Sequence, residues 1–163
     1  MPINLPTVSE VELISYRFAY ETMNWGEPIP DFVTRFPGVL ERCLGQLQQT
    51  YDGQELYPGL IKKASILFYL MIKNHPFPNG NKRLAITTLL TFLYRNKKWI
   101  AVDQQELYLF AKRVAESDSV LSKNILKEIE IFFEGHIIKK GLIYFLCWSL
   151  LTLRARIKKA RPA

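Results

Sequence analysis

The stretch His75-Pro76-Phe77-Pro78-Asn79-Gly80-Asn81-Lys82-Arg83 lies between the two most apolar segments of the chain. Upstream, residues 64–72 carry no charged side chain, and downstream, residues 84–94 carry none either. Segments that are apolar on every side are typical of helices buried in a protein core. The sequence therefore predicts two central buried helices joined by a polar loop, with the remaining helices packed around them.

The polar loop combines residues that restrict the backbone with residues that carry charge. Two prolines stiffen it, and Gly80 permits a tight turn into the second helix. The first turn of that helix then contains Lys82 and Arg83, although the positive end of a helix dipole favours acidic residues. A bound anion would offset this repulsion, and a phosphate suits the unpaired N–H groups of a helix N-terminus.

His75, at the start of the loop, adds a side chain that can take a proton near neutral pH. Beside a bound phosphate, it indicates a reaction in which a hydroxyl loses its proton and attacks phosphorus. The residues alone leave a second interpretation open, in which the stretch is a polar loop and both cations face solvent.

The stretch also resembles the signature of the Fic/Doc family, H-x-F-x-(D/E)-(G/A)-N-(G/K)-R. The matching positions, all at the right spacing, are His75, Phe77, Gly80, Asn81, Lys82 and Arg83. Position 82 is glycine in most Fic proteins, and the lysine found here makes the stretch resemble the Doc (death-on-curing) branch. The resemblance extends over roughly residues 9–134, which are expected to form the Fic/Doc-like domain.

This resemblance implies an all-α fold, a helical bundle around the helix-loop-helix that carries the motif. It implies a transferase that moves a phosphoryl group, or AMP, from a nucleotide such as ATP to a hydroxyl side chain of a target protein, with Mg²⁺ on the phosphates. The Doc branch favours phosphoryl transfer and a toxin-type role in the cytoplasm. It also implies a small antitoxin and a target such as translation elongation factor Tu.

The family's site residues carry over onto the matching positions of this chain. By that analogy His75 is the general base, and Phe77 points into the core and anchors the loop. The residues expected to hold the nucleotide phosphates are Gly80, Asn81, Lys82 and Arg83.

Three positions depart from the family pattern. Asn79 stands where the family has an acid that holds Mg²⁺, and an amide oxygen is a weaker ligand than a carboxylate. Ile86 replaces a second arginine of nucleotide-transferring relatives, and Glu134 lacks the Ser/Thr four residues before it that an inhibitory helix requires. Asn79 therefore supports an alternative, a catalytically weakened member that acts as a protein- or membrane-binding module.

A short segment ahead of the first buried helix, residues 51–57, contains the turn signal Asp52-Gly53. The resemblance implies a flap here, which would hold the target's backbone beside the active site by strand addition. Its target-positioning residues would be Asp52, Gly53, Gln54 and Glu55. An ordinary connection between helices is the other interpretation.

The C-terminal part of the chain has a different composition from the rest. All of the net charge of +7 comes from seven basic residues after Glu134, where no acidic residue occurs: Lys139, Lys140, Arg154, Arg156, Lys158, Lys159 and Arg161. Residues 141–153 carry no charge, and they are too few for a membrane span. We expect residues 135–163 to form an apolar and then basic helical extension, which packs on the bundle or a partner or lies on a membrane surface. The lack of interleaved aromatic residues argues against a nucleic-acid arm.

Capping and turn residues predict the other helices. We expect helices over residues 9–23, with Val11, Ile14 and Phe18 on the buried side, and over 37–49, 58–74, 80–96, 103–116 and 122–134, with a brief extended link at 99–102. Cys43 and Cys147 are expected to be reduced and buried, and two cysteines with two histidines show no zinc-ligand spacing.

Overall fold

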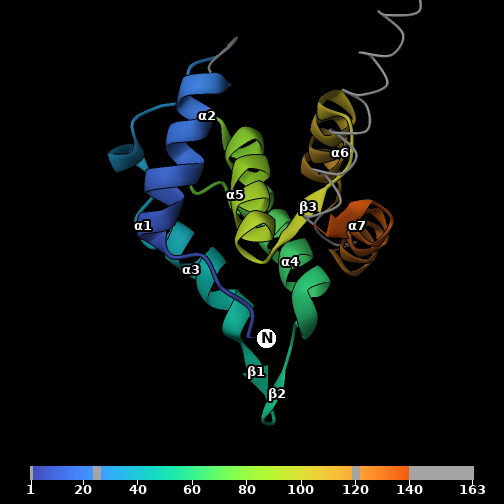
Figure 1. Ribbon diagram of the computed structural model, residues 1–163. Helices are drawn as coiled ribbons and strands as arrows, with labels where there is room; N and C mark the ends of the chain where they lie inside the picture. The colour runs from blue at the N-terminus through green and yellow to red at the C-terminus, as the bar shows by residue number, and fades with distance from the viewer. Residues whose placement is uncertain (1, 24–26, 119–121, 140–163) are drawn as a thin grey trace, which may run out of the picture.

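The computed structural model describes residues 2–23, 27–118 and 122–139 (Figure 1). Helices dominate these ranges, and their strands are only two or three residues long, which confirms the predicted all-α fold. In chain order the elements are α1 (Val8–Glu10), η1 (Val11–Tyr16), α2 (Arg17–Thr22), η2 (Phe32–Thr34), α3 (Val39–Gly45), η3 (Gln46–Gln48), β1 (Thr50–Tyr51), β2 (Gln54–Glu55), α4 (Gly59–Lys73), α5 (Asn81–Arg95), β3 (Lys98–Ile100), α6 (Gln104–Glu116), α7 (Ser122–His136) and β4 (Ile137–Lys139).

The two apolar segments form the central helices α4 and α5, as predicted. Figure 1 shows them in the middle of the molecule, with α1 and α2 on one side and α6 and α7 on the other. The Phe68 ring of α4 stacks on Phe110 of α6 and meets Phe133 of α7 edge-on. Because helices pack against α4 and α5 on two sides, the loop that joins them is held at a fixed place in the bundle.

The N-terminal helical stretch begins as predicted but buries a different face. Thr7 and Glu10 form a reciprocal capping box at its start. Ile14 and Phe18, expected in the core, are 48% and 49% exposed, so this part of the prediction was wrong. The reason is the π-helical turn η1, whose wider turn brings Val11, Ser15 and Tyr16 to the buried side. The residue of α2 that is buried in the same way is Ala19.

The C-terminal side of the described chain contains a pairing that the sequence did not predict. The expected extended link is strand β3, which pairs antiparallel with β4, and Trp99 lies opposite Ile138. The expected helix over 141–153, Cys147 and most of the basic tail lie outside the described residues, so the division of the chain at residue 134 stays a prediction. Among the residues with a described position, no helix combines the length and apolarity of a membrane span.

Residues 50–55 form a β-hairpin, which confirms the turn predicted at Asp52-Gly53. Strands β1 and β2 are joined by Asp52 and Gly53, whose φ angles of 50° and 73° both lie in the left-handed region that two-residue hairpin turns require. Lys63 of α4 anchors this hairpin, because its buried amine donates to the Leu47 carbonyl at 2.7 Å and lies 3.2 Å from the Glu55 carboxylate.

Replacing Lys63 tests this anchor. Lys63→Met keeps the apolar stem but leaves the Leu47 carbonyl without its donor, so we expect the free energy of unfolding to fall by about 1–3 kcal/mol in chemical denaturation. The neighbouring Lys62 is exposed, and Lys62→Met should change stability by no more than about 0.5 kcal/mol. Equal effects of the two substitutions would contradict the anchoring role.

Candidate active site

The motif loop has a left-handed backbone conformation at both of its ends. His75 has a φ of 47°, a left-handed conformation that is uncommon for residues with a side chain. Gly80, the N-cap of α5, has a φ of 79°, and a Cβ there would lie 3.1 Å from Ile29 Cγ1. Glycine is therefore required at position 80 both by the backbone angle and by the close approach of Ile29.

Phe77 ties the loop to the hydrophobic core. Its side chain is fully buried and packs between the rings of Tyr16 and Phe32, with ring centroids 6.4 and 5.6 Å away. This burial gives Phe77 the anchoring position that the sequence indicated.

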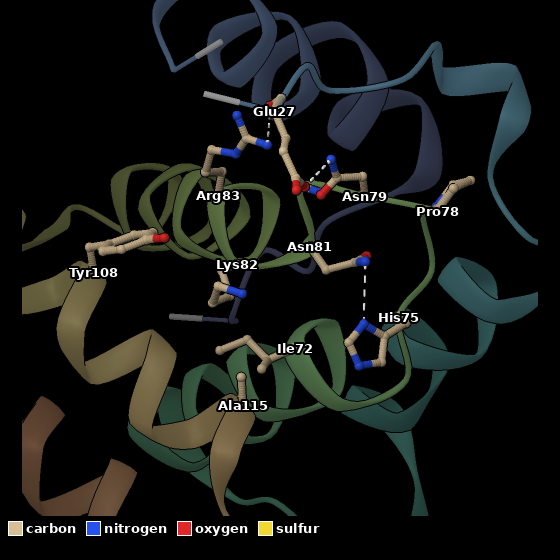
Figure 2. Close-up of a pocket in the computed structure, with 11 residues that line it drawn as sticks. Glu27, Ile72, His75, Pro78, Asn79, Asn81, Lys82, Arg83, Tyr108 and Ala115 are labelled. Atoms are coloured by element: carbon tan, nitrogen blue, oxygen red, sulfur yellow. Dashed lines mark hydrogen bonds between the residues drawn. The ribbon is translucent and has the colours of Figure 1, made fainter. Parts of the chain in front are cut away.

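The side chain of Asn81 holds the loop in its turn. Its Oδ1 accepts a hydrogen bond from Phe77 N at 3.0 Å, while its Nδ2 donates to Phe77 O at 2.7 Å. The same Nδ2 lies 3.4 Å from His75 Nδ1 (Figure 2). Since the amide is engaged with the loop backbone, its main effect is to position His75.

The two cations of the first turn of α5 have different surroundings. Arg83 is buried, and its guanidinium donates to the carbonyl oxygens of Met23 and Glu27, each at 2.8 Å. Lys82 is half-buried, lines the pocket, and makes no ion pair with any residue that the structure describes. The charge available to a ligand at this helix end therefore comes mainly from Lys82.

These groups surround a pocket of about 470 Å³, a volume within the range of small-molecule sites. Figure 2 shows Asn81 and Lys82 at the start of α5 and His75 below Asn81, with Tyr108 and Ala115 contributed by α6. The N-cap of α5 is Gly80, which has no side chain to cap the first turn, so the positive end of the helix dipole lies at the pocket that Gly80, Asn81 and Lys82 line. The motif residues that line the pocket are His75, Pro78, Asn79, Gly80, Asn81, Lys82 and Arg83.

A comparison with protein-family models matches residues 11–93 to the Fic/DOC family. The chain belongs to the Fic/DOC family. Among characterised proteins, it is 36% identical over 66 residues to a protein named Toxin Doc from Mycolicibacterium smegmatis, a match that covers 40% of this chain and 51% of that protein. The chain thus spans about half the length of this Fic/DOC relative. No solved structure matches the chain at a significant level.

The hairpin predicted as a Fic/DOC flap lies away from this pocket. It precedes the first turn of α4, whereas the motif follows the last turn of that 15-residue helix, about 22 Å further along its axis (Figure 1). None of the four predicted residues, Asp52, Gly53, Gln54 and Glu55, lines the pocket. The geometry therefore does not place them to position a target beside His75.

A different segment, residues 27–36, lies along the motif loop, and the sequence did not reveal this. The Phe36 N–H donates to the Pro76 carbonyl at 2.9 Å. The Tyr16 hydroxyl also holds the segment, because it donates to the Pro30 carbonyl at 3.0 Å. Burial, with a smaller effect of the Asp31 carboxylate, raises the pKa of Tyr16, so this hydroxyl stays a donor. The prolines at 28, 30 and 37 indicated a rigid loop but not what the loop contacts.

Position 79 is also tied to this segment. Asn79 Oδ1 accepts from Gly80 N, and Asn79 Nδ2 donates to the Glu27 carboxylate at 3.0 Å and to the Pro28 carbonyl at 3.3 Å. The described residues contain no group of three or more His, Cys, Asp or Glu side chains that could form an all-protein metal site. A magnesium ion bound with a nucleotide needs only one or two carboxylates beside the phosphates, so the Glu27 carboxylate next to Asn79 fits the ion.

The contrast between Lys82 and Arg83 can be measured directly. Arg83→Met removes two charge-assisted bonds and leaves the Met23 and Glu27 carbonyls unpaired, so we expect a loss of about 2–4 kcal/mol in the free energy of unfolding. Lys82→Met removes the same charge from the neighbouring residue and should cost no more than about 0.5 kcal/mol. If chemical denaturation gave similar losses for both variants, the bonds from Arg83 to the Met23 and Glu27 carbonyls would not be what stabilises this part of the fold.

Proposed function

We propose that this protein is a nucleotide-dependent transferase, which moves a phosphoryl group, or AMP, from a nucleotide such as ATP to a hydroxyl side chain of a target protein. The observation that carries the proposal is a single pocket in which the uncapped N-terminus of α5, Lys82 and His75 meet. Membership of the Fic/DOC family supports the same reaction class.

The phosphates would bind at the first turn of α5. Gly80 would allow the backbone to approach the ligand, and the first N–H groups of the helix would donate to it at the positive end of the dipole. Lys82 adds a full charge at this point, and the pocket's partly buried position increases the strength of that attraction. A magnesium ion bound with the nucleotide would neutralise further phosphate charge.

His75 would act as the general base. Its side chain is exposed at the edge of the pocket, so a hydroxyl on a protein surface can approach the imidazole ring. The hydroxyl oxygen would lose its proton to His75 and form a bond to the γ-phosphorus. The bond between that phosphorus and the bridging oxygen would break, leaving ADP with the electron pair, while His75 passes its proton to solvent.

Transfer of AMP would use the same groups with the nucleotide reversed. The attack would then occur at the α-phosphorus, and pyrophosphate would leave. Lys82 in the motif and Ile86 in place of a second arginine favour phosphoryl transfer.

The match to a protein named Toxin Doc supports a toxin-type role, in which the target is a cellular protein and a small antitoxin restrains the activity. Translation elongation factor Tu is the first target to test, with ATP as co-substrate and a cytoplasmic reaction.

The absence of a carboxylate at position 79 favours a second candidate function. In that case the protein is a catalytically weakened family member that binds a partner protein or membrane surface. The two functions differ in whether His75 is needed for a covalent product.

A label-transfer assay distinguishes these functions. Purified protein is incubated with bacterial lysate, Mg²⁺ and ATP labelled at the α or the γ position. We expect label from the γ position alone, and His75→Asn should lower its transfer about 10²–10⁴-fold. Asparagine is chosen because it tolerates the positive φ of position 75 better than alanine does.

His136→Asn serves as the matched control, because His136 lies on α7 against Phe132 and outside the pocket. This variant should transfer label at the wild-type rate. Label from the α position would identify AMP transfer, and transfer that is equal in wild type and His75→Asn would contradict the proposed base. No label from either position would support the weakened, binding-only function.

A further inference from the structure

The pocket contains a carboxylate that the motif does not encode. Glu27 lines the pocket 52 residues upstream of Asn79, and the Asn79 amide donates to its Oε2 at 3.0 Å. Figure 2 shows the Glu27 side chain extending from its own loop down to Asn79, at the rim above Asn81. An acid is therefore present next to position 79, although it comes from a different part of the chain.

The backbone of Glu27 is secured independently of its side chain. The buried Arg83 guanidinium donates to the Glu27 carbonyl at 2.8 Å, and the next residue accepts from Asn79 through the Pro28 carbonyl at 3.3 Å. Two motif residues thus hold the Glu27 turn against the loop. The side chain therefore reaches the pocket from a backbone that is held at the Glu27 and Pro28 carbonyls.

The hydrogen bond also orients the carboxylate. Oε2 accepts from Asn79, while Oε1 has no hydrogen-bond or ion-pair partner among the described residues, although the carboxylate lines a pocket with a cation and a helix N-terminus. An oxygen of this kind is a hard, anionic ligand, which Mg²⁺ and Mn²⁺ prefer. An acid at position 79 would instead place two carboxylates about 3 Å apart, an arrangement in which both cannot stay ionised without a cation between them.

We propose that Glu27 supplies the carboxylate that binds the divalent cation of the nucleotide, in the place of the acid that the family signature has at position 79. Asn79 is then a positioning residue, whose amide holds Glu27 toward the phosphates. This inference rests on the proposed function for the nucleotide itself, but it concerns only where the cation is bound.

The exchange of partners makes a specific test available. In this chain an amide at 79 donates to a carboxylate at 27. The double variant Glu27→Gln with Asn79→Asp reverses the pair, so that an amide at 27 can donate to a carboxylate at 79. We expect the cation to bind whether the carboxylate of this hydrogen-bonded pair is at position 27 or at position 79.

The measurement is Mn²⁺ binding, followed by the loss of the free-ion signal in electron paramagnetic resonance, with a non-hydrolysable ATP analogue present at a fixed concentration. Binding to protein, nucleotide and both together is compared, so that cation held by the analogue alone is subtracted. The variants are Glu27→Gln, the reversed double variant and Glu12→Gln, which removes the same charge from an exposed position outside the pocket.

We expect Glu27→Gln to weaken Mn²⁺ binding to the protein–nucleotide complex by about tenfold or more, since changes in the shell around a metal already cost 10–100-fold. Glu12→Gln should bind as wild type does, and the reversed pair should recover most of the lost affinity. If Glu27→Gln bound Mn²⁺ with the wild-type affinity, the inference would be overturned. It would also be overturned if Glu27→Gln bound the nucleotide more tightly than wild type both with and without the cation, because Glu27 would then only repel phosphate. Absence of Mn²⁺ binding to the wild-type complex would also overturn it.

Label transfer is scored separately from cation binding. If Mn²⁺ binding depends on Glu27 but no His75-dependent label appears, the proposed transferase function fails and the cation site stands. If label transfer depends on His75 but Mn²⁺ binding ignores Glu27, the function stands and this inference fails.

Discussion

The site depends on one side-chain amide, that of Asn81, which closes the motif loop through both polar groups of the Phe77 backbone. Phe77 is at the same time fully buried in the core. The hydrogen bonds therefore join a residue of the first turn of α5 to a residue that cannot move without opening the hydrophobic interior. His75, two residues before Phe77, takes its position from this arrangement, and so does the direction in which the N-terminus of α5 faces.

A second layer of contacts brings a distant part of the chain to the loop. Tyr16, Arg83 and Asn79 each bond to a backbone carbonyl of the segment that begins at residue 27. These bonds explain why the motif arginine Arg83 is buried. They also make the pocket a joint product of the N-terminal third of the chain and the central helices, so a change in either part alters the other.

Features encoded by neighbouring residues could be predicted from the sequence. The uncharged runs predicted α4 and α5, and Thr7 with Glu10 predicted the start of the first helix. Asp52-Gly53 predicted the hairpin turn. The apolar pattern did not predict the buried side of the first helix correctly, because tertiary packing determines which of several local conformations forms. The π-helical turn in η1 changed which residues of the first helix are buried, because a wider turn shifts the register of every residue after it.

The candidate site was predicted in part for the same reason. The motif residues are adjacent in sequence, so their meeting in one pocket required only a helix-loop-helix. Glu27 could not be found this way, because an exposed acid in a proline-containing loop follows no periodicity and its partner is 52 residues away. The hairpin was expected at the site because of the family resemblance, yet the length of α4 separates the hairpin from the motif loop.

The central claim is that the first turn of α5 holds nucleotide phosphates next to His75. The most direct measurement is a crystal structure of the protein with a non-hydrolysable ATP analogue and Mn²⁺, with anomalous data to locate the ion. We expect phosphate density at the N–H groups of α5 within reach of Lys82, and an anomalous peak beside the Glu27 carboxylate. Nucleotide bound elsewhere, with the pocket between α5 and α6 empty, would contradict it.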